Sequence, residues 1–271
     1  MSLHASEQIA RWDAERLALV LQELGGEGAP VDSGWMACDV PGSWADYAGG
    51  LGMDGEVSDA SLDSLVNFYQ QRGRTPKIAI SPYQHPSLLS GLRRRGFVLD
   101  EVQHNLVRTL DDLPSPSKDV GIEFIEVDPA KPEATARFVE AHLAGFFPTG
   151  DAPAGMHPIA RRVVEAQPRS RQWLAMAGET IVGSGGLERY GEGAALIMAS
   201  TVTGWRRRGI QQAFFRYRLE EAARMGCRFA IVGSSPGGPT ERNAIRCGFR
   251  LAGVQLELSL QQLPAMSYAA P

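Results

Sequence analysis

The strongest constraint on the fold is an internal repeat that relates two parts of the chain. Six residues between Gly96 and Leu106 recur between Gly248 and Leu258 at one constant offset, reading Gly-Phe-x-Leu-x-x-Val-Gln-x-x-Leu in each copy. Each copy follows a short apolar segment that predicts a buried strand, at residues 77–80 and 228–231. A gap-free match favours two related folding units over the chance likeness of any two strand-helix-strand segments.

A proline-rich segment separates the two copies. Residues 113–119 contain Pro114 and Pro116 among polar neighbours, a composition that neither a helix nor a central strand continues through. We interpret it as a linker between an N-terminal lobe, residues 1–112, and a C-terminal lobe, residues 120–262, with a tail at residues 263–271. The length of 271 residues fits two ordinary domains.

Hydrophobic periodicity predicts the elements of both lobes. The second lobe begins with a meander of strands and ends with a strand-helix-strand unit, which is an α+β arrangement. We expect its strands at residues 122–127, 172–176, 181–188, 195–202, 229–232 and 251–260, and its helices at residues 133–144, 158–166, 209–225 and 240–246. In the first lobe we expect helices at residues 6–25 and 61–72.

Composition excludes several classes of protein. Charged residues make up 21% of the chain, with 27 Lys and Arg against 31 Asp and Glu, so neither disorder nor a global positive field for nucleic acid is expected. No apolar run approaches the roughly 20 residues that span a bilayer. The three cysteines lack the spacing of a metal site or a disulfide framework, which favours a reducing, cytoplasmic setting.

One segment concentrates positive charge where a helix is expected to begin. Residues 201–212 read Thr-Val-Thr-Gly-Trp-Arg-Arg-Arg-Gly-Ile-Gln-Gln and join a predicted strand to a predicted helix. Unpaired amides at a helix start, three arginines and a glycine that allows close approach together suit a pyrophosphate. A solvated loop ahead of an ordinary helix fits the same residues, which match neither a Walker loop nor G-x-G-x-x-G.

The segment Arg206-x-x-Gly209-x-Gln211 resembles the Arg/Gln-x-x-Gly-x-Gly/Ala signature of the GNAT superfamily of CoA-dependent N-acyltransferases, and departs from it only at the last position. Asn243-Ala244-x-x-x-Gly248-Phe249 is similar to the closing helix of that family, and the order of elements over residues 120–262 matches its fold. The resemblance implies an α+β protein of two GNAT-like lobes, each a mixed, mostly antiparallel sheet flanked by helices. The first lobe is degenerate, and the second holds a β-α-β core that binds CoA.

The resemblance also implies the residues that hold the cofactor, acetyl-CoA. In the family two neighbouring strands splay apart, so backbone groups of residues 199–203 pair with pantetheine while loop amides hold the pyrophosphate. The implied cofactor-binding residues are Thr201, Val202, Thr203, Arg206, Arg207, Arg208, Gly209, Ile210, Gln211, Gln212 and Asn243. Two alternatives stay open: Gln211 either points away or donates to the ligand, and Asn243 either bonds to pantetheine or caps its helix.

The expected reaction is direct attack of a primary amine on the thioester, without a covalent enzyme intermediate. The amine must lose a proton, and a backbone amide near Ser200 or Thr201 would stabilise the oxyanion. Many family members carry a tyrosine as general acid where this chain has Ala244, and the strand before the loop carries no carboxylate. The remaining catalytic candidates, each of which also fits a structural role, are Glu188 as a base, Tyr190 as an acid or substrate contact, and Ser235 near the thiolate.

We therefore expect an acyl-CoA-dependent N-acyltransferase that acts on a small-molecule amine, with no metal, nucleic acid or membrane as partner. The alternative is a non-catalytic sensor or scaffold that binds acyl-CoA, which the missing tyrosine and carboxylate favour. The acceptor, the acyl chain length and a homodimer stay open. His142, on an expected helix, either faces the acceptor loop of the family or is an ordinary half-buried histidine.

Overall fold

The computed structural model describes residues 3–24, 26–113, 121–166 and 169–261. Before the linker the elements are α1 (Leu3–Leu24), β1 (Glu27–Val31), β2 (Gly34–Cys38), β3 (Ala48–Gly49), α2 (Asp59–Gln70), β4 (Lys77–Ile80), α3 (Pro86–Arg94) and β5 (Phe97–Thr109). After it they are β6 (Glu123–Glu126), α4 (Pro132–Phe146), α5 (Met156–Ala166), β7 (Ser170–Ala177), β8 (Thr180–Tyr190), β9 (Gly193–Thr201), the short 3-10 helix η1 (Thr203–Trp205), α6 (Ile210–Arg224), β10 (Phe229–Ser234), α7 (Pro239–Arg246) and β11 (Arg250–Leu260).

The predicted elements are all present, with ends within three residues of the expected ones. We refer to the parts before and after the linker as the N-terminal and C-terminal halves. The linker itself, apart from Leu113, and the tail at residues 263–271 lie outside the described residues. The α+β fold class is confirmed.

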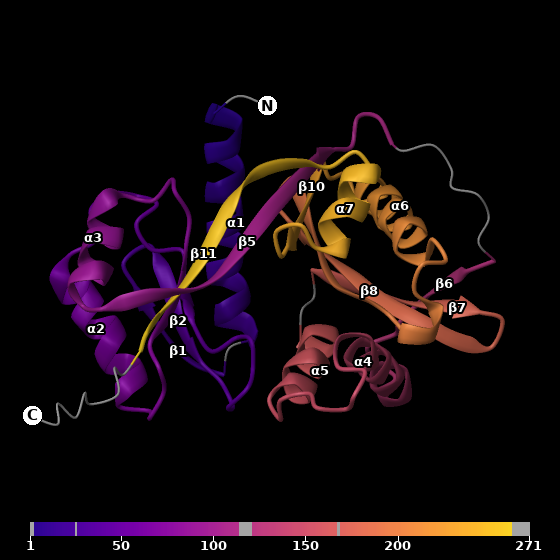
Figure 1. The fold of residues 1–271 in the computed structure, drawn as a ribbon, viewed down its shortest axis with the longest axis horizontal. Coiled ribbons are helices and arrows are strands. Elements are labelled where there is room, and N and C mark those ends of the chain that lie inside the picture. Colours follow the sequence, from indigo (N-terminus) through magenta and orange to yellow (C-terminus); the bar gives the residue numbers. More distant parts are fainter. Residues whose placement is uncertain (1–2, 25, 114–120, 167–168, 262–271) are drawn as a thin grey trace, which may run out of the picture.

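Within the described residues the strands form one sheet, in the order β1-β2-β3-β4-β11-β5-β10-β9-β8-β7-β6 (Figure 1). The neighbours β3 and β4 are parallel, as are β9 and β10, and the remaining neighbours are antiparallel. The sheets expected for the two lobes are thus joined edge to edge into a single mixed sheet.

The two halves exchange their last strands. The final part of β5, which ends the N-terminal half, pairs with β10 of the C-terminal half, and β11 of the C-terminal half pairs with β4 of the N-terminal half. The exchanged strands also pair with each other, from Phe97 opposite Leu260 to Val107 opposite Arg250. Figure 1 shows β5 and β11 crossing side by side from one half to the other. Each half is therefore completed by a strand of the other.

The internal repeat explains this pairing. The exchanged strands carry the repeated residues, and their antiparallel register sets Leu99 opposite Leu258 and Leu106 opposite Leu251. These two pairs exchange equivalent residues, so the halves are related by an approximate twofold axis. Leu106 enters the core beneath α6 and α7, and Leu258 enters the core of the N-terminal half. The repeated residues that predict two units therefore also form the strand pair that joins them.

Helices cover both faces of the sheet in each half. In the C-terminal half α6 and α7 lie on one face and α4 and α5 on the other (Figure 1). In the N-terminal half α2 and α3 pack on one face, and α1 packs on the other. The α1 helix also contacts α5 and β11, so it lies between the halves and packs against both.

A chain of buried charges fastens α1 to the C-terminal half. Arg16 of α1 donates from Nη2 to Asp13 Oδ1 at 2.8 Å and from Nη1 to Glu188 Oε2 of β8 at 2.9 Å. The other oxygen of Glu188 lies 3.1 Å from Arg169, which also pairs with Glu23 of α1. Glu188 is only 1% exposed, so its charge depends on these arginines.

Replacing Arg16 with methionine is expected to lower the free energy of unfolding by about 3 kcal/mol, because Asp13 and Glu188 stay buried and lose a cation. Arg11→Met is the control on the same helix, since the ion pair of Arg11 with Asp54 is largely exposed and such pairs contribute about 0–1 kcal/mol. Urea denaturation measures both variants. Equal losses would show that the buried charges do not hold α1 in place.

Candidate functional site

The parallel strands β9 and β10 pair only near their starts. Their register runs from Gly193 opposite Phe229 to Ala195 opposite Ile231, with no further pair between described residues. Both strands continue past this point, β9 to Thr201 and β10 to Ser234. Beyond Ala195 and Ile231 the two strands are no longer paired with each other, so their facing backbone groups form no ladder bonds. The strands diverge there, as the resemblance implies, and we call this divergence the splay.

A β-bulge in β9 lies beside this splay. Gly186 of β8 pairs with Ile197, and Ser184 pairs with Ser200, so β9 has one residue more than β8 between the two pairs. Met198, within the bulge, has a φ of 52°, which is rare for a residue with a side chain. The bulge turns one peptide group of β9 out of the regular ladder.

The carbonyl of that peptide is held from the α4 side of the sheet. Met198 O accepts hydrogen bonds from His142 Nδ1 of α4 at 3.1 Å and from Ser184 Oγ at 3.4 Å. In a planar trans peptide the next N–H points the opposite way. The Ala199 amide therefore points away from α4 and from the groups that hold the Met198 carbonyl.

The amides that follow alternate in direction along β9. The Val202 amide donates to the Val182 carbonyl of β8 at 3.0 Å. Because successive N–H groups of a strand point to opposite sides, the Thr201 amide points away from β8 and the Ser200 amide points toward it. Of the two amides predicted near the oxyanion, the orientation favours that of Thr201, and the bulge adds the amide of Ala199.

His142 is buried where it supports the bulge. The residue is 7% exposed, and its ring centroid lies 6.3 Å from that of Phe138 and 4.9 Å from that of Phe146. Burial lowers the pKa of His142 to about 4, so the imidazole is neutral at physiological pH. Since a carbonyl oxygen only accepts, Nδ1 carries the ring proton in its bond to Met198.

The loop after β9 enters α6 through two left-handed residues. Arg207 has a φ of 64° and Gly209, the N-cap of α6, a φ of 82°. The first backbone bond of α6 joins the Ala213 amide to the Gly209 carbonyl at 3.0 Å, so the amides of residues 209–212 precede the intrahelical ladder. Ile210 is buried in the core, which anchors the turn while its amides face outward.

The three arginines of this loop have different surroundings. Arg206 donates from Nη2 to the Gly145 carbonyl at the end of α4 at 2.7 Å, and so ties the loop to that helix. The Arg208 guanidinium lies 4.4 Å from the ring centre of Trp205. Arg207 is exposed, and its side chain has no hydrogen bond or ion pair with another residue that the structure describes. Arg207 is thus the arginine of this loop whose charge is paired with no group in the described part of the chain.

Amide side chains connect the first turn of α6 to α7. Gln211 Nε2 donates to Thr240 Oγ1 at 3.1 Å, Asn243 Nδ2 donates to Gln211 Oε1 at 2.5 Å, and Gln212 Nε2 donates to Asn243 Oδ1 at 3.2 Å. Gln211 therefore points away from the loop amides, which is the first of its two alternatives. Asn243 does not cap its helix, because the N-cap of α7 is Gly238.

The structure does not bring Glu188 to the splay. Glu188 pairs with Ala195 across the β8–β9 ladder, whereas Gly183 pairs with Thr201, so Glu188 lies at the opposite end of these strands from the loop. Both of its oxygens bind arginines. The expectation of a base at Glu188 is corrected accordingly: a buried carboxylate held in two ion pairs anchors α1 instead of facing a substrate.

Tyr190 is likewise placed against α1. Its ring meets that of Trp12 edge-on at 5.8 Å, and its hydroxyl donates to Glu15 at 3.5 Å. Burial raises the pKa of the Tyr190 phenol. Tyr190 pairs with Gly193, at the end of β8 and β9 away from the loop. The expectation of an acid or substrate contact at Tyr190 is therefore corrected: the side chain packs against α1. Ser235 is exposed directly after β10, at the open end of the splay, and its carbonyl accepts from the Ser234 hydroxyl.

One pair near the splay carries no sequence signal. His104 of β5 stands opposite Ser234 of β10, and its Nδ1 lies 2.9 Å from Oε1 of Glu241 on α7. The two residues are 137 positions apart and meet only because β5 crosses into the C-terminal half. No motif or spacing in the sequence relates them.

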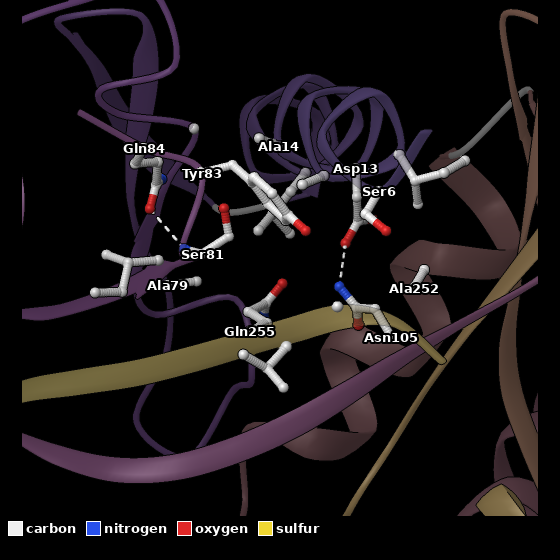
Figure 2. Close-up of a pocket in the computed structure, with 17 residues that line it drawn as sticks. Ser6, Asp13, Ala14, Ala79, Ser81, Tyr83, Gln84, Asn105, Ala252 and Gln255 are labelled. Carbon is white, nitrogen blue, oxygen red and sulfur yellow. Dashed lines mark hydrogen bonds between the residues drawn. The ribbon is translucent and has the colours of Figure 1, made fainter. Parts of the chain in front are cut away.

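A separate cavity lies on the α1 side of the crossing strands (Figure 2). Asp13 from α1, Asn105 from β5, Gln255 from β11 and Ser81, which follows β4, are among the residues that line it. Asn105 Nδ2 donates to Asp13 Oδ2 at 3.1 Å, so the acid is already paired. The internal volume of about 30 Å³ accommodates one or two water molecules and excludes a nucleotide.

The residues that the structure describes form neither a metal-ligand cluster nor a membrane-spanning helix. In residues 3–24, 26–113, 121–166 and 169–261, no three His, Cys, Asp or Glu side chains gather as metal ligands would. Over the same ranges no helix combines the length and the apolar character needed to cross a membrane. The three cysteines form no disulfide, and burial raises the pKa of each thiol.

No family model matches the sequence, and no curated protein matches it either. Solved structures do match. A GCN5-related N-acetyltransferase from Kribbella flavida is 16% identical, over 91% of this chain and 95% of that one, with a TM-score of 0.67. Another from Sphaerobacter thermophilus is 16% identical over 74% and 67%, with a TM-score of 0.57. A tandem GNAT protein from the clavulanic acid biosynthesis pathway is 14% identical over 76% and 70%, with a TM-score of 0.55. The GNAT-like α+β fold that the resemblance implies is confirmed.

The buried imidazole of His142 predicts a pH dependence of stability. Its pKa is about 4 in the folded protein against 6.5 for a free histidine, so between these pH values the unfolded chain binds a proton that the folded protein does not. The free energy of unfolding should fall on acidification through this range, by up to about 3 kcal/mol from this residue. His142→Gln, which can still donate to Met198, is the control in urea titrations. Parallel curves for the two proteins would contradict the prediction.

Proposed function

Because the chain has the fold of the GCN5-related N-acetyltransferase (GNAT) superfamily, we propose that it binds acyl-CoA and transfers the acyl group to a primary amine. We assign this activity to residues 120–262, completed by β5 of the residues 1–112. The observation that carries the proposal is the splay between β9 and β10, with the start of α6 at its mouth.

The residues of the loop fit the pyrophosphate of CoA. The amides of residues 209–212 have no intrahelical partner, and the positive end of the α6 dipole adds to them. Gly209 lets a phosphate come close, and the unengaged charge of Arg207 lies beside the same turn. Arg206 and Arg208 shape the loop through their contacts with Gly145 and Trp205. Acetyl-CoA is the donor we propose to test first.

The splayed end of β9 would bind the rest of the donor. Thr201, Val202 and Thr203 follow the bulge. The Val202 amide is already bonded to Val182, so in this proposal the amides of Thr201 and Thr203 pair with pantetheine. The turned peptide between Met198 and Ala199 offers its N–H as a fixed dipole for the oxyanion. His142 keeps that peptide from turning back, so we assign it a positioning role.

The proposed acceptor is a small-molecule primary amine. Phe146 ends α4 beside His142 and is 55% exposed, so it offers an apolar surface for part of a small-molecule amine. The net charge of -4 favours a cationic acceptor over an anionic one. Three unbonded cysteines agree with a reducing, cytoplasmic setting. The oligomeric state, a homodimer included, is to be measured beside activity.

A second function is supported by one observation. Ala244, at the position where many family members carry a tyrosine as general acid, is fully buried. The carboxylate of Glu188 is committed to arginines. A protein that binds acyl-CoA as a sensor or scaffold, without transfer, needs neither group.

Changes in the loop are expected to weaken CoA binding, measured by isothermal titration calorimetry. Gly209→Glu should raise Kd by about a hundredfold or more, because it forces a side chain into a left-handed backbone and sets a carboxylate beside the phosphates. Arg207→Ala should raise Kd about tenfold through one lost charge-assisted hydrogen bond. Arg93→Ala removes the same charge from α3 in the other half and should leave Kd unchanged. Unaltered affinity in both loop variants would refute the proposed site.

Transfer itself is tested by incubating the wild-type protein and acetyl-CoA with a panel of primary amines. We expect one or more amines to gain the mass of an acetyl group by mass spectrometry, with release of an equal amount of free thiol. Gly209→Glu is the matched control and should show neither signal. Tight CoA binding without mass gain on any amine would establish the sensor in place of the transferase.

A further inference from the structure

We propose that His104 and Glu241 are the proton-transfer pair of this site, so that a strand from the N-terminal half supplies a catalytic residue to the C-terminal half. The inference rests on the proposed function and adds to it a base for the attacking amine. It follows from the geometry of the pair, from its position relative to the splay, and from the contacts that make other titratable groups poorer bases.

The pair has the arrangement of an oriented base. His104 Nδ1 lies 2.9 Å from Glu241 Oε1, and the other oxygen of Glu241 accepts from the Gly237 amide. These two bonds lower the pKa of the Glu241 carboxyl, so it is an ionised acceptor. Nδ1 of His104 must then be the donor, which leaves a lone pair on Nε2. A carboxylate that fixes the ring and its tautomer is the means by which a histidine is prepared to take a proton.

The pair is level with the open end of the splay, next to β10 on the side away from β9. His104 is opposite Ser234, the last residue of β10, three residues beyond Ile231, where the pairing of β10 with β9 ends. Directly opposed residues share one face of a sheet, so both side chains lie on the α7 side. Thr240, next to Glu241 in the chain, accepts the hydrogen bond from Gln211 of α6. One residue therefore separates the pair from the turn that carries the loop amides.

The pair is partly open to solvent. The side chain of His104 is 23% exposed and that of Glu241 is 13% exposed. An imidazole buried as deeply as His142 binds a proton too weakly to serve as a base near neutral pH. The side chain of His104 is more exposed than His142, so solvent or a ligand can reach its ring.

The proposed step moves one proton from nitrogen to sulfur. As the amine nitrogen bonds to the thioester carbonyl carbon, it gives a proton to Nε2 of His104. When the carbon–sulfur bond breaks, the imidazolium returns that proton to the leaving thiolate. The products are the amide and the free thiol of CoA, and the histidine ends in its starting form. No oxidant, metal or covalent enzyme intermediate is needed.

Three other titratable groups are poorer candidates for the base. His142 donates its ring proton in a hydrogen bond to the Met198 carbonyl, and its lowered pKa makes it a weak base. Glu188 lies at the far end of β8 in two ion pairs. Burial raises the pKa of the Cys247 thiol, which suits packing better than proton transfer at neutral pH.

The position of His104 is tested by NMR of its ring nitrogens, identified by their loss in His104→Gln. Addition of CoA should shift them, because the thiol end of CoA enters the splay. Addition of 3′,5′-ADP, which has the nucleotide and lacks pantetheine, should leave them in place. Binding of CoA without a shift at His104 would overturn the inference alone. Failure of the wild-type protein to bind CoA would overturn the proposed function and the inference with it.

The catalytic role is tested with the amine that the wild-type protein acetylates fastest. His104→Ala should lower kcat about 10²- to 10³-fold while the KM for acetyl-CoA stays the same, and added imidazole should restore part of the rate. Glu241→Gln should lower kcat about tenfold. His157→Ala, which replaces an exposed histidine of α5, is the control and should leave kcat unchanged. A wild-type kcat in His104→Ala, a loss that imidazole does not restore, or CoA binding without turnover of any amine would each overturn the role.

Discussion

The antiparallel pairing of β5 with β11 is the interaction on which the rest of the structure depends. It joins the sheets of the two halves, and it carries each strand to the half in which it completes the sheet. The C-terminal half gains from this exchange the strand beside β10. Without it β10 would be an edge strand with unpaired backbone groups, and the splay would have no rigid wall on that side. The charges around Arg16 then set α1 across the junction.

The candidate site combines local features that each have a simple cause. Gly209 provides the left-handed turn into α6, and buried Ile210 holds that turn against the core. The bulge at Met198 turns one peptide, and His142 holds its carbonyl. A loop for phosphates and a polarised amide thus lie at the two ends of one short segment, residues 198–209. Such a spacing suits a ligand that is anionic at one end and reactive at the other.

Much of the fold follows from the sequence, because alternation in strands and periodicity in helices depend on near neighbours. The loop is predictable for the same reason: Arg206, Gly209 and the helix start are contiguous. The chemistry at a distance is not. Glu188 reads as a free carboxylate at a strand end until Arg16 and Arg169 arrive from elsewhere. His104 reads as an isolated histidine until the strand exchange brings it to Glu241. The repeat indicates two units, but it does not predict that they exchange strands.

The exchange also sets the order in which the chain becomes complete. β11 is the last described strand, and it fills the place between β4 and β5 in the middle of the sheet. Lys77 of β4 and Glu257 of β11, which form an ion pair, are 180 residues apart. The N-terminal half therefore leaves the ribosome with a gap in its sheet, which closes only after residues 250–260 have been synthesised. A ribosome that stops short of β11 releases a chain whose N-terminal half lacks the strand between β4 and β5.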